Sequence, residues 1–218
     1  MNFIAIIIYV IAAYLLGSIS IAVIISKRWY HSDIRTHGSG NAGSTNVYRT
    51  FGWKAGLIVQ IGDILKGVFA ALLPLIGNWL FALSPAEDIV KIQIACGCCA
   101  VIGHLFPIFS QFRGGKGMNT ILGMMLVVSP WIALIAIGVF LLVFFASQYV
   151  SLASMLAVAS FPIYVLCSPF YRENLFFELF AWFLFLLVVY THRENIQRLK
   201  THSERKVNIF GKKNRSIS

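Results

Sequence analysis

Charged residues are scarce in this sequence, and acidic residues are the scarcest. Only 12% of the 218 residues are charged, and eight of those are Asp or Glu. Soluble globular domains carry about 25% charged residues, so the composition excludes that class. Apolar residues take their place: 58% of the chain is hydrophobic and the mean hydropathy is +0.78. We therefore expect a protein whose main solvent is the lipid bilayer.

Cysteine is also rare, and its positions do not form a ligand set. Cys96, Cys98, Cys99 and Cys167 fall inside apolar segments, and none is paired at metal-ligand spacing with a neighbouring histidine. Buried thiols of this kind act as small packing residues. We expect no metal site, no cofactor and no disulfide.

The charges that are present are mostly positive. Eighteen Lys and Arg residues against eight Asp and Glu residues give a formal net charge of +10. In a soluble protein this balance would raise the question of nucleic acid binding. Here the basic residues lie between and after apolar runs, where they orient a membrane protein and meet anionic lipids or substrates. We expect membrane lipid as a partner and no nucleic acid.

Long apolar runs divide the chain into membrane spans. About 20 apolar residues cross a bilayer as a helix, and clusters of charge, Pro and Gly mark the ends. The first run is too long for a signal peptide and has no basic residue before it. Seven spans are predicted: 3–25, 55–76, 89–106, two within 118–147 separated at Pro130, 151–168 and 175–191. One kinked helix over 118–147 is the alternative.

The basic residues decide between these alternatives, because positive charge favours the cytoplasmic side. An even number of spans between residues 113–116 and the tail places fifteen basic residues on one side, whereas one kinked helix would export the tail. We therefore predict an all-α polytopic membrane protein with its N-terminus outside and its C-terminus cytoplasmic. A single membrane domain covers 1–218 and includes a basic tail at 192–218. The fifteen residues are Lys27, Arg28, Arg35, Arg49, Lys54, Arg113, Lys116, Arg193, Arg198, Lys200, Arg205, Lys206, Lys212, Lys213 and Arg215.

The loop between the first two spans contains a dense polar run from Gly38 to Arg49. Its glycines let backbone N–H groups converge on an oxyanion, its hydroxyls and amides donate further hydrogen bonds, and Arg49 can bind a phosphate in bidentate fashion. A solvated flexible loop is the alternative. The glycines also fit a dinucleotide-binding pattern, which we reject because no strand precedes them. The candidate binding residues are Ser39, Asn41, Thr45, Asn46 and Arg49.

A second polar segment covers 103–117 and ends in a glycine-lysine turn at the start of a helix. There, backbone N–H groups, the helix dipole and an ammonium can hold a phosphate. The turn is not a P-loop, because Ser110 replaces the first glycine of that motif and a glycine replaces the magnesium-binding Ser or Thr. ATP is therefore not implied. A glycine turn anchored at the membrane interface is the alternative. The turn consists of Gly114, Gly115, Lys116 and Gly117.

A third polar segment begins at His192, where the last span ends. His192 and Asn195 stand three apart, so on a continuing helix they share a face and point into a site at the membrane surface. Snorkelling explains the basic residues around them.

Three further polar residues lie inside predicted spans. Asp63 and Lys66 also stand three apart, and burying such a pair in a membrane is costly. They either neutralise each other and fasten a loop or contact substrate directly. His104 is predicted to be a structural, hydrogen-bonding histidine.

Together the three segments resemble the acyl-phosphate:glycerol-3-phosphate acyltransferases, the PlsY family. The family motifs read approximately S-G-N-x-G-A-T-N-x-x-R, G-H-x-F-P-x-F-x-x-F-K-G-G-K-G and H-R-E-N-I-x-R-L-x-x-G-x-E, and they match 39–49, 103–117 and 192–204 in that order. The departures are Ser44 for Ala, Arg113 for Lys, His202 for Gly, and Ser20 where a Pro often follows Gly-Ser-Ile.

The resemblance implies an enzyme of the bacterial inner membrane with a cytoplasmic active site. It would transfer a fatty acyl group from acyl phosphate to the 1-hydroxyl of sn-glycerol 3-phosphate, giving lysophosphatidate and inorganic phosphate in phospholipid biosynthesis. The resemblance also implies a functional link to the enzyme that makes acyl phosphate. The sequence agrees on one point, because it lacks the H-x-x-x-x-D signature of thioester-using acyltransferases.

The family pattern also implies roles for individual residues. His192, Asn195 and Ser39 are the predicted catalytic residues. Either His192 or a phosphate oxygen of the donor removes the proton of the attacking hydroxyl. We prefer the donor phosphate, because no relay from histidine to carboxylate is apparent. The glycerol 3-phosphate site is expected to contain Ser39, Arg49, Lys116, His192 and Asn195, supported by Gly114, Gly115 and Gly117, with Ser151 and Ser154 as candidates for holding the donor.

Two other functions compete with this one. An anion transporter would suit the basic loops and the Asp63–Lys66 pair, but it predicts polar segments near the bilayer midplane, whereas the motifs gather at one face. A membrane phospho-alcohol transferase or phosphatase would need clustered carboxylates, whereas those near the motifs, such as Asp63 and Glu194, stand far apart in the sequence.

Overall fold

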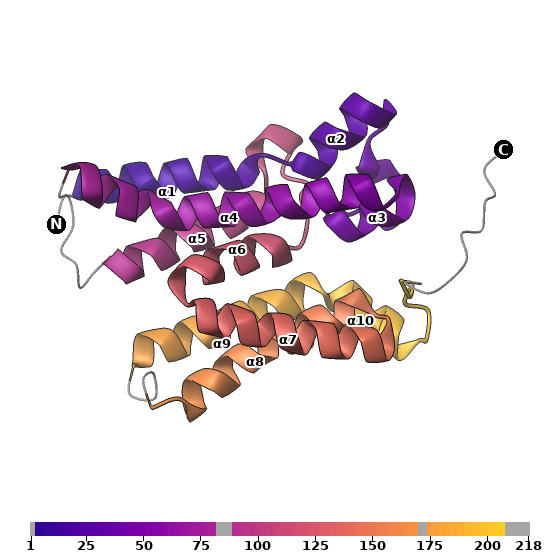
Figure 1. Cartoon of the computed structure of the whole chain (residues 1–218). Helices are drawn as coiled ribbons and strands as arrows, with labels where there is room; N and C mark the ends of the chain where they lie inside the picture. The colour runs from indigo at the N-terminus through magenta and orange to yellow at the C-terminus, as the bar shows by residue number, and fades with distance from the viewer. Residues whose placement is uncertain (1–2, 82–88, 170–173, 208–218) are drawn as a thin grey trace. The chain divides into compact units, whose positions relative to one another are not determined.

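The structure, a computed structural model, describes residues 3–81, 89–169 and 174–207, and the regular structure in these ranges is helical (Figure 1). The chain divides into two compact units, Met1–Leu134 and Ile135–Ser218. The helices are α1 (Phe3–Ser18), α2 (Ile21–Tyr30), α3 (Ser44–Phe51), α4 (Trp53–Phe81), α5 (Ile89–Leu105), α6 (Met118–Val128), α7 (Pro130–Ser147), α8 (Val150–Cys167), α9 (Leu175–Thr191) and α10 (Arg193–Lys200), with short 3-10 turns η1 (Ile34–Thr36) and η3 (Ile108–Ser110).

Five helical segments are long and apolar enough to cross a membrane, and α9 with α10, bent by 61° at their junction, is a sixth candidate. Within the described ranges the chain is therefore an all-helical membrane protein with five or six candidate spans. The five segments are Phe3–Tyr30, Trp53–Leu80, Ile89–Ser110, Pro130–Ser147 and Val150–Cys167.

The predicted break before Pro130 is present. α6 ends at Val128, and Ser129 is not helical, with φ −152° and ψ 84°. α6 has 11 residues. At 1.5 Å per residue it is about 16 Å long, roughly half of a ~30 Å hydrocarbon core. The seventh crossing therefore stays a prediction.

The first span contains a break that the sequence analysis did not expect. α1 ends at Ser18 and α2 begins at Ile21, so Ile19 and Ser20 interrupt the helix. The ammonium of Lys66 on α4 donates a hydrogen bond to the carbonyl oxygen of Ile19 at 3.3 Å. A backbone carbonyl released by the break is thus satisfied inside the bundle, as a membrane requires.

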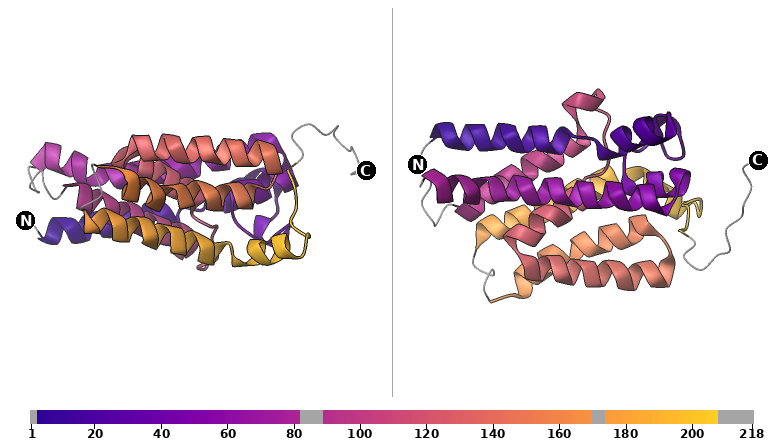
Figure 2. Two further views of the ribbon diagram at one scale, coloured as in Figure 1. Left: turned by 90° about the horizontal axis from the view of Figure 1, so that it is seen from below. Right: turned by 45° about the horizontal axis from the view of Figure 1, so that its top comes forward.

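In the first unit, α1, α4, α5 and α6 lie side by side (Figure 2), and small residues let them pack closely. Gly17 on α1 lies against the carbonyl oxygen of Ala100 on α5, and Gly123 on α6 lies against the carbonyl oxygen of Ile64 on α4. A methyl group on either glycine would collide with these oxygens. Glycine permits this approach, and close packing drives helix association where the surrounding lipid is as apolar as the helices.

The course of these helices brings two of the polar segments to one end of the first unit. α1 and α2 run toward that end, α4 runs away from it and α5 returns (Figures 1 and 2). The loop 31–43 with α3 therefore lies at the same end as the segment 106–117. Two candidate spans, Trp53–Leu80 and Ile89–Ser110, separate them.

In the second unit, α8 packs against α9, and the rings of Phe161 and Phe180 meet edge to face at 5.5 Å. After α10 the chain returns to the start of α8, where the Val207 backbone N–H donates to the carbonyl oxygen of Gln148 at 2.9 Å. The beginning of α8 and the whole of α10 thus lie at one end of this unit.

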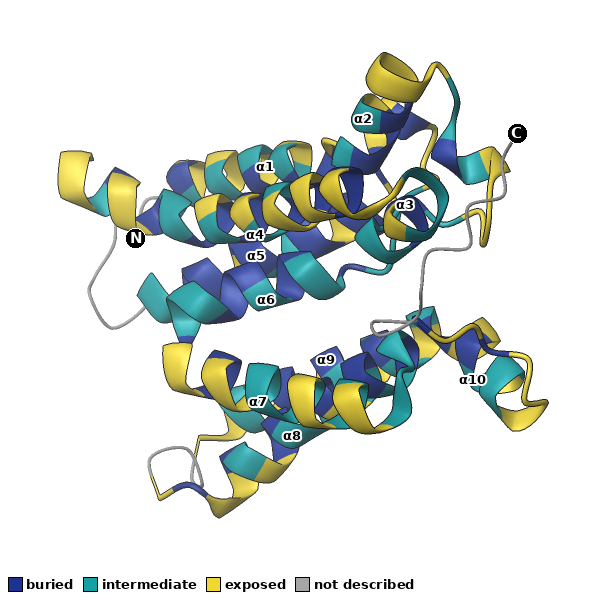
Figure 3. Cartoon of the chain, turned by 45° about the vertical axis from the view of Figure 1, so that its right-hand side comes forward, coloured by how far each residue is buried: buried dark blue, intermediate teal, exposed yellow. Residues whose placement is uncertain are grey.

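Exposed residues occur along the outer surfaces of the helices (Figure 3), and many of them carry large apolar side chains. Trp79 is 84% exposed, and Trp131 and Leu142 are each 74% exposed. Exposed apolar surface on this scale marks contact with another apolar phase. For helices of this length and composition, that phase is lipid.

Candidate active site

Asn46 organises the first polar segment. Its side-chain oxygen accepts from the backbone N–H of Ser39 at 3.0 Å. Its amide nitrogen lies 3.0 Å from the carbonyl oxygens of His37 and Asn41 and 3.3 Å from that of Ile34. The residue is 5% exposed. The Asn46 amide therefore shapes the loop around Ser39, which is a positioning role within the predicted binding segment.

Two glycines let the loop close around Asn46. Gly38 has φ +62° and Gly40 has φ +71°, a region that other residues rarely adopt. A side chain on Gly38 would also strike the Asn46 amide oxygen. Between these glycines Ser39 is exposed, while Thr45 and Arg49 on α3 are half-buried. The predicted anion-binding groups thus sit on a loop of defined shape.

The glycine-lysine turn of the second segment is bonded to the first segment through the backbone. The N–H of Ala42 donates to the carbonyl oxygen of Gly114 at 3.3 Å, and the N–H of Gly115 donates to the carbonyl oxygen of His104 at 3.2 Å. Gly117, with φ +81°, is the N-cap of α6, and the half-buried Lys116 precedes it. The turn therefore presents an ammonium beside a helix N-terminus, a favourable position for a phosphate.

Side chains add two further links between these segments. The Asn119 amide donates to the Ser44 hydroxyl at 3.0 Å. Arg35 donates from Nη1 to the carbonyl oxygen of Ser110 at 2.7 Å and pairs with Asp33 at 2.7 Å. Hydrogen bonding by Arg35 holds the pKa of the Asp33 carboxyl well below its usual range. From sequence alone, Arg35 is expected only to help orient the chain in the membrane, and nothing local in the sequence indicates this connection.

A buried polar cluster lies beneath the turn. The Lys66 ammonium is 3.0 Å from Asp63 Oδ1, and His104 Nδ1 is 3.5 Å from the same oxygen. All three side chains are less than 10% exposed. The ring of His104 also fills the space where Gly115 would carry a side chain. Two roles are predicted for Asp63 and Lys66: neutralising each other to fasten a loop, or contacting substrate. These contacts fit the first role.

In the second unit, the third polar segment is organised by a carboxylate that the sequence analysis quoted only as part of a motif. Glu204 Oε1 accepts from the Ser151 hydroxyl and from the Asn195 amide, each at 2.8 Å. Its other oxygen accepts from Arg198 Nε at 2.9 Å. Burial raises the pKa of Glu204, but the hydrogen bonds from Arg198, Asn195 and Ser151 outweigh it, so the pKa is lowered.

His192 stands at a bend rather than on a continuous helix. The last span does not continue as one straight helix, because α9 and α10 meet at His192 with a 61° bend, but His192 is the N-cap of α10 and stands one turn before Asn195. Both side chains are buried, at 3% and 7% exposure. His192 Nδ1 lies 2.9 Å from the carbonyl oxygen of Val188. A carbonyl only accepts, so Nδ1 carries the hydrogen, and in the neutral form of the ring the lone pair is on Nε2.

The predicted site residues thus form two groups, one in each unit. The first contains Ser39, Asn41, Thr45, Asn46, Arg49, Gly114, Gly115, Lys116 and Gly117, with Lys66 in the cluster beneath them. In the second, Ser151 and Asn195 meet at Glu204, His192 lies at the bend, and Ser154 is buried one turn beyond Ser151 at 5% exposure. That both groups form one site stays a prediction. Among the residues that the structure describes, no group of three or more His, Cys, Asp or Glu side chains is arranged to hold a metal ion.

The chain is similar to known glycerol-3-phosphate acyltransferases over nearly its whole length. The family model "Glycerol-3-phosphate acyltransferase" matches residues 7–202. A glycerol-3-phosphate acyltransferase of Clostridioides difficile is 44% identical, over 92% of this chain and 95% of the relative. The enzyme named glycerol-3-phosphate acyltransferase 2 of Bacillus anthracis is 43% identical, over 90% of this chain and 96% of the relative.

The chain is also similar to solved structures of an enzyme with this activity. The crystal structure of PlsY, an integral membrane glycerol 3-phosphate acyltransferase, in its glycerol 3-phosphate form matches with a TM-score of 0.79 and 39% identity, covering 93% of this chain and 95% of that one. A second structure of PlsY, in its lysophosphatidic acid form, matches with a TM-score of 0.76. The chain therefore belongs to the PlsY family of glycerol-3-phosphate acyltransferases, integral membrane enzymes that form lysophosphatidic acid.

Proposed function

We propose that the chain transfers the acyl group of an acyl phosphate to the 1-hydroxyl of glycerol 3-phosphate and releases inorganic phosphate. One observation carries this choice of donor. Two segments suited to oxyanions are hydrogen-bonded to each other through Ala42 and Gly114. Two adjacent oxyanion-binding segments suit a reaction in which both substrates carry a phosphate.

The proposed glycerol 3-phosphate site is built on the first unit. Arg49 and Lys116 neutralise the phosphate, Ser39 donates a hydrogen bond, and the glycine turn supplies backbone N–H groups. Asn46 holds the loop, and Asn41 and Thr45 complete it. His192 and Asn195 would orient the glycerol end, and Asn195 with backbone N–H groups would stabilise the oxyanion that develops on the carbonyl oxygen of the acyl group. Ser151 and Ser154 would hold the donor.

The chemistry requires one proton transfer and no redox step. The C1 oxygen of glycerol 3-phosphate attacks the acyl carbon, an ester bond forms, and the bond from that carbon to the phosphate oxygen breaks. Phosphate is a good leaving group and can take up the hydroxyl proton directly when the two are held close together. His192 Nδ1 lies against the neutral carbonyl of Val188, where a triad would have a carboxylate. We therefore keep the donor phosphate as the base.

The proposed topology has seven crossings, an external N-terminus and an active site on the cytoplasmic side of the bacterial inner membrane. Its support is the fifteen basic residues that this arrangement places on one side. α6, short as it is, would complete the crossing between the second polar segment and α7.

An assay of the acyl donor tests the proposal. The purified full chain in detergent is given glycerol 3-phosphate with either acyl phosphate or acyl-CoA, and both lysophosphatidate and inorganic phosphate are measured. We expect product only with acyl phosphate, in equal amounts of the two species. Arg49→Lys should lose at least about tenfold in kcat/KM, because lysine cannot bind phosphate in bidentate fashion, whereas the exposed Arg193→Lys should not. Product from acyl-CoA alone would overturn the choice of donor.

A further inference from the structure

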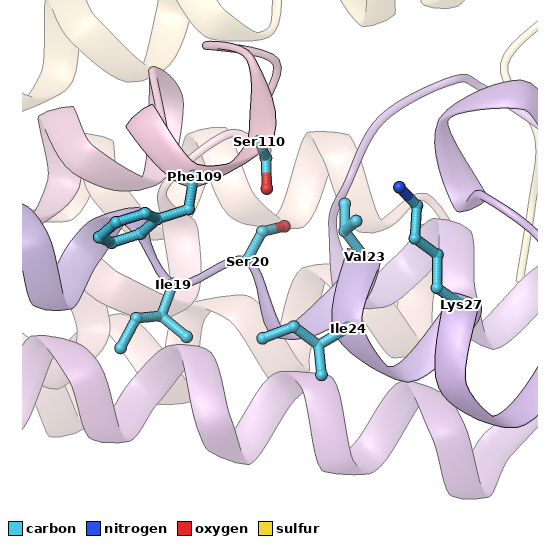
Figure 4. A pocket seen from close by; sticks show the side chains of 7 residues that line it. All are labelled: Ile19, Ser20, Val23, Ile24, Lys27, Phe109 and Ser110. Atoms are coloured by element: carbon cyan, nitrogen blue, oxygen red, sulfur yellow. The ribbon is translucent and has the colours of Figure 1, made fainter.

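A cavity of about 370 Å³ lies beside the break in the first span, between that break and η3 (Figure 4). None of the residues predicted to bind substrate lines it. All of its lining residues belong to the candidate spans Phe3–Tyr30 and Ile89–Ser110, and Lys27, Phe109 and Ser110 lie within three residues of the ends of those spans. The cavity is therefore in reach of lipid near the edge of the hydrocarbon core. The lining residues are Ile19, Ser20, Val23, Ile24, Lys27, Phe109 and Ser110.

Two largely buried serines point their hydroxyl groups into this cavity. Ser20 is 8% exposed and Ser110 is 7% exposed, and Figure 4 shows their oxygens turned into the space between them. Across the part of the chain that the structure describes, neither hydroxyl has a hydrogen-bond partner in the protein, and neither oxygen is enclosed by protein atoms, so both can donate to a ligand in the cavity. Ser20 is also the N-cap of α2 and makes no capping hydrogen bond to that helix. The cavity thus combines two free donors with a helix N-terminus.

The charge beside the cavity is positive. The Lys27 ammonium lies at its side, and the side chain is 58% exposed. Lys27 is 3.5 Å from the Asp33 carboxylate, which pairs more closely with Arg35, at 2.7 Å. Two cations therefore share one carboxylate, which leaves a net charge of about +1 to attract an anion.

The remaining wall is apolar and open to the surface. Ile19, Ile24 and Phe109 are 38%, 49% and 65% exposed. A ligand that fits has an anionic head with oxygens that accept hydrogen bonds and a chain that prefers lipid. The volume lies at the lower end of the range of small-molecule sites, roughly 300–1,000 Å³. It suits a headgroup with the first carbons of a chain.

We propose that this cavity binds the phosphate head of an anionic membrane lipid, with the lipid chain lying along Ile19, Ile24 and Phe109. The phosphate accepts hydrogen bonds from Ser20, Ser110 and the first turn of α2, and Lys27 neutralises it. This is a second lipid site, apart from the one at which lysophosphatidic acid is made. Ser20 is its least expected member, because it stands where the family motif often has Pro.

Photocrosslinking tests the proposal without any turnover. The full chain in neutral detergent is illuminated with phosphatidic acid that carries a diazirine on the first carbons of its acyl chain, and the labelled peptides are mapped by mass spectrometry. Labels are expected on residues 19–24 and on Phe109. The double variant Ser20→Ala, Lys27→Gln should lose at least about tenfold in labelling there, since each lost phosphate contact weakens binding several-fold. Ser20→Ala removes no cap bond, so the fold should be retained.

A control variant and three competing ligands test whether the labelling depends on the lipid headgroup. Lys54→Gln removes another exposed lysine and should leave the labelling of 19–24 unchanged. Unlabelled phosphatidic acid should compete, while diacylglycerol and millimolar inorganic phosphate should not. Equal labelling of the double variant, or competition by diacylglycerol, would overturn the headgroup contacts. Competition by inorganic phosphate at the same concentration as lipid would show a site for free anions instead.

Discussion

Single side chains set the shape of each polar segment. Asn46 ties together the backbone of the first segment, and Glu204 gathers the side chains of Ser151, Asn195 and Arg198. A buried group with several partners costs more to remove than any one partner, because each partner then loses its hydrogen bond. The residues that organise these segments are thus distinct from those expected to touch substrate.

Replacing Glu204 with Gln should destabilise the second unit by about 2 kcal/mol, the typical value of a charge-assisted hydrogen bond. Glu194→Gln is a matched control, because Glu194 also faces Arg198, but at 3.7 Å and with a side chain that is 69% exposed. That control should change stability by less than about 0.5 kcal/mol. Thermal unfolding in detergent measures both, and equal effects of the two variants would contradict the assignment.

The same carboxylate predicts a dependence of stability on pH. Its pKa in the folded protein is lowered from the ordinary value of 4.5. The folded state therefore binds a proton less readily than the unfolded chain. The stabilisation by Glu204 is fully present at pH values above the ordinary pKa, and it is lost as the pH falls through the lower pKa of the folded state. Glu204→Gln should show a smaller loss of stability than the wild type between neutral pH and pH values below 4.5.

At the scale of helices, close packing rather than sequence hydropathy fixes the arrangement. Gly17 and Gly123 face backbone oxygens of neighbouring helices, whereas Gly138 on α7 has no neighbouring atom within 4 Å of an added methyl group. Gly17→Ala should lower stability by about 1–3 kcal/mol through overpacking. Gly138→Ala should be neutral or slightly stabilising, because alanine favours helix. Detergent melting curves that rank the two variants the other way would contradict this packing.

Lys66 links α4 to the break in the first span, and its role can be separated from substrate binding. Lys66→Met alone leaves Asp63 buried without its ammonium partner and should cost about 3–5 kcal/mol. Adding Asp63→Asn removes that charge, so the double variant should recover most of the stability. If the pair only fastens the helices, the recovered protein keeps its KM for glycerol 3-phosphate. A stable double variant with a strongly raised KM would assign Lys66 to the substrate instead.

The sequence predicted the helices better than their interruptions. Apolar runs located the spans, and Ser129-Pro130 marked a break that is present. The break at Ile19–Ser20, the bend at His192 and the short helix α3 were missed, because tertiary contacts rather than local signals decide them. The roles of Arg35 and Glu204 depend on partners 75 and 53 residues away. A single sequence shows that such residues are polar, but not which groups they meet.

For the whole molecule, the proposed topology predicts which side of the membrane each end of the helices faces. Cysteine labelling tests this prediction best at exposed positions. Gly115 and Asn195 are unsuitable, because a side chain on Gly115 would strike His104 and because Asn195 is buried. In a cysteine-free background, Thr36→Cys, Gln111→Cys and Gln197→Cys should all react with an impermeant reagent from the cytoplasmic side. Exposed Cys167, restored alone at the far end of α8, should react from the other side. A split among the first three would overturn the proposed topology.

The spacing of Asp63 and Lys66 also bears on how the protein enters the membrane. The two residues face each other at i and i+3 on one helix, 3.0 Å apart. Their charges are therefore neutralised as soon as α4 is inserted, before α5 has been synthesised and can deliver His104 to the same carboxylate. The nascent chain is thus never required to hold a lone carboxylate in lipid while it waits for its next helix.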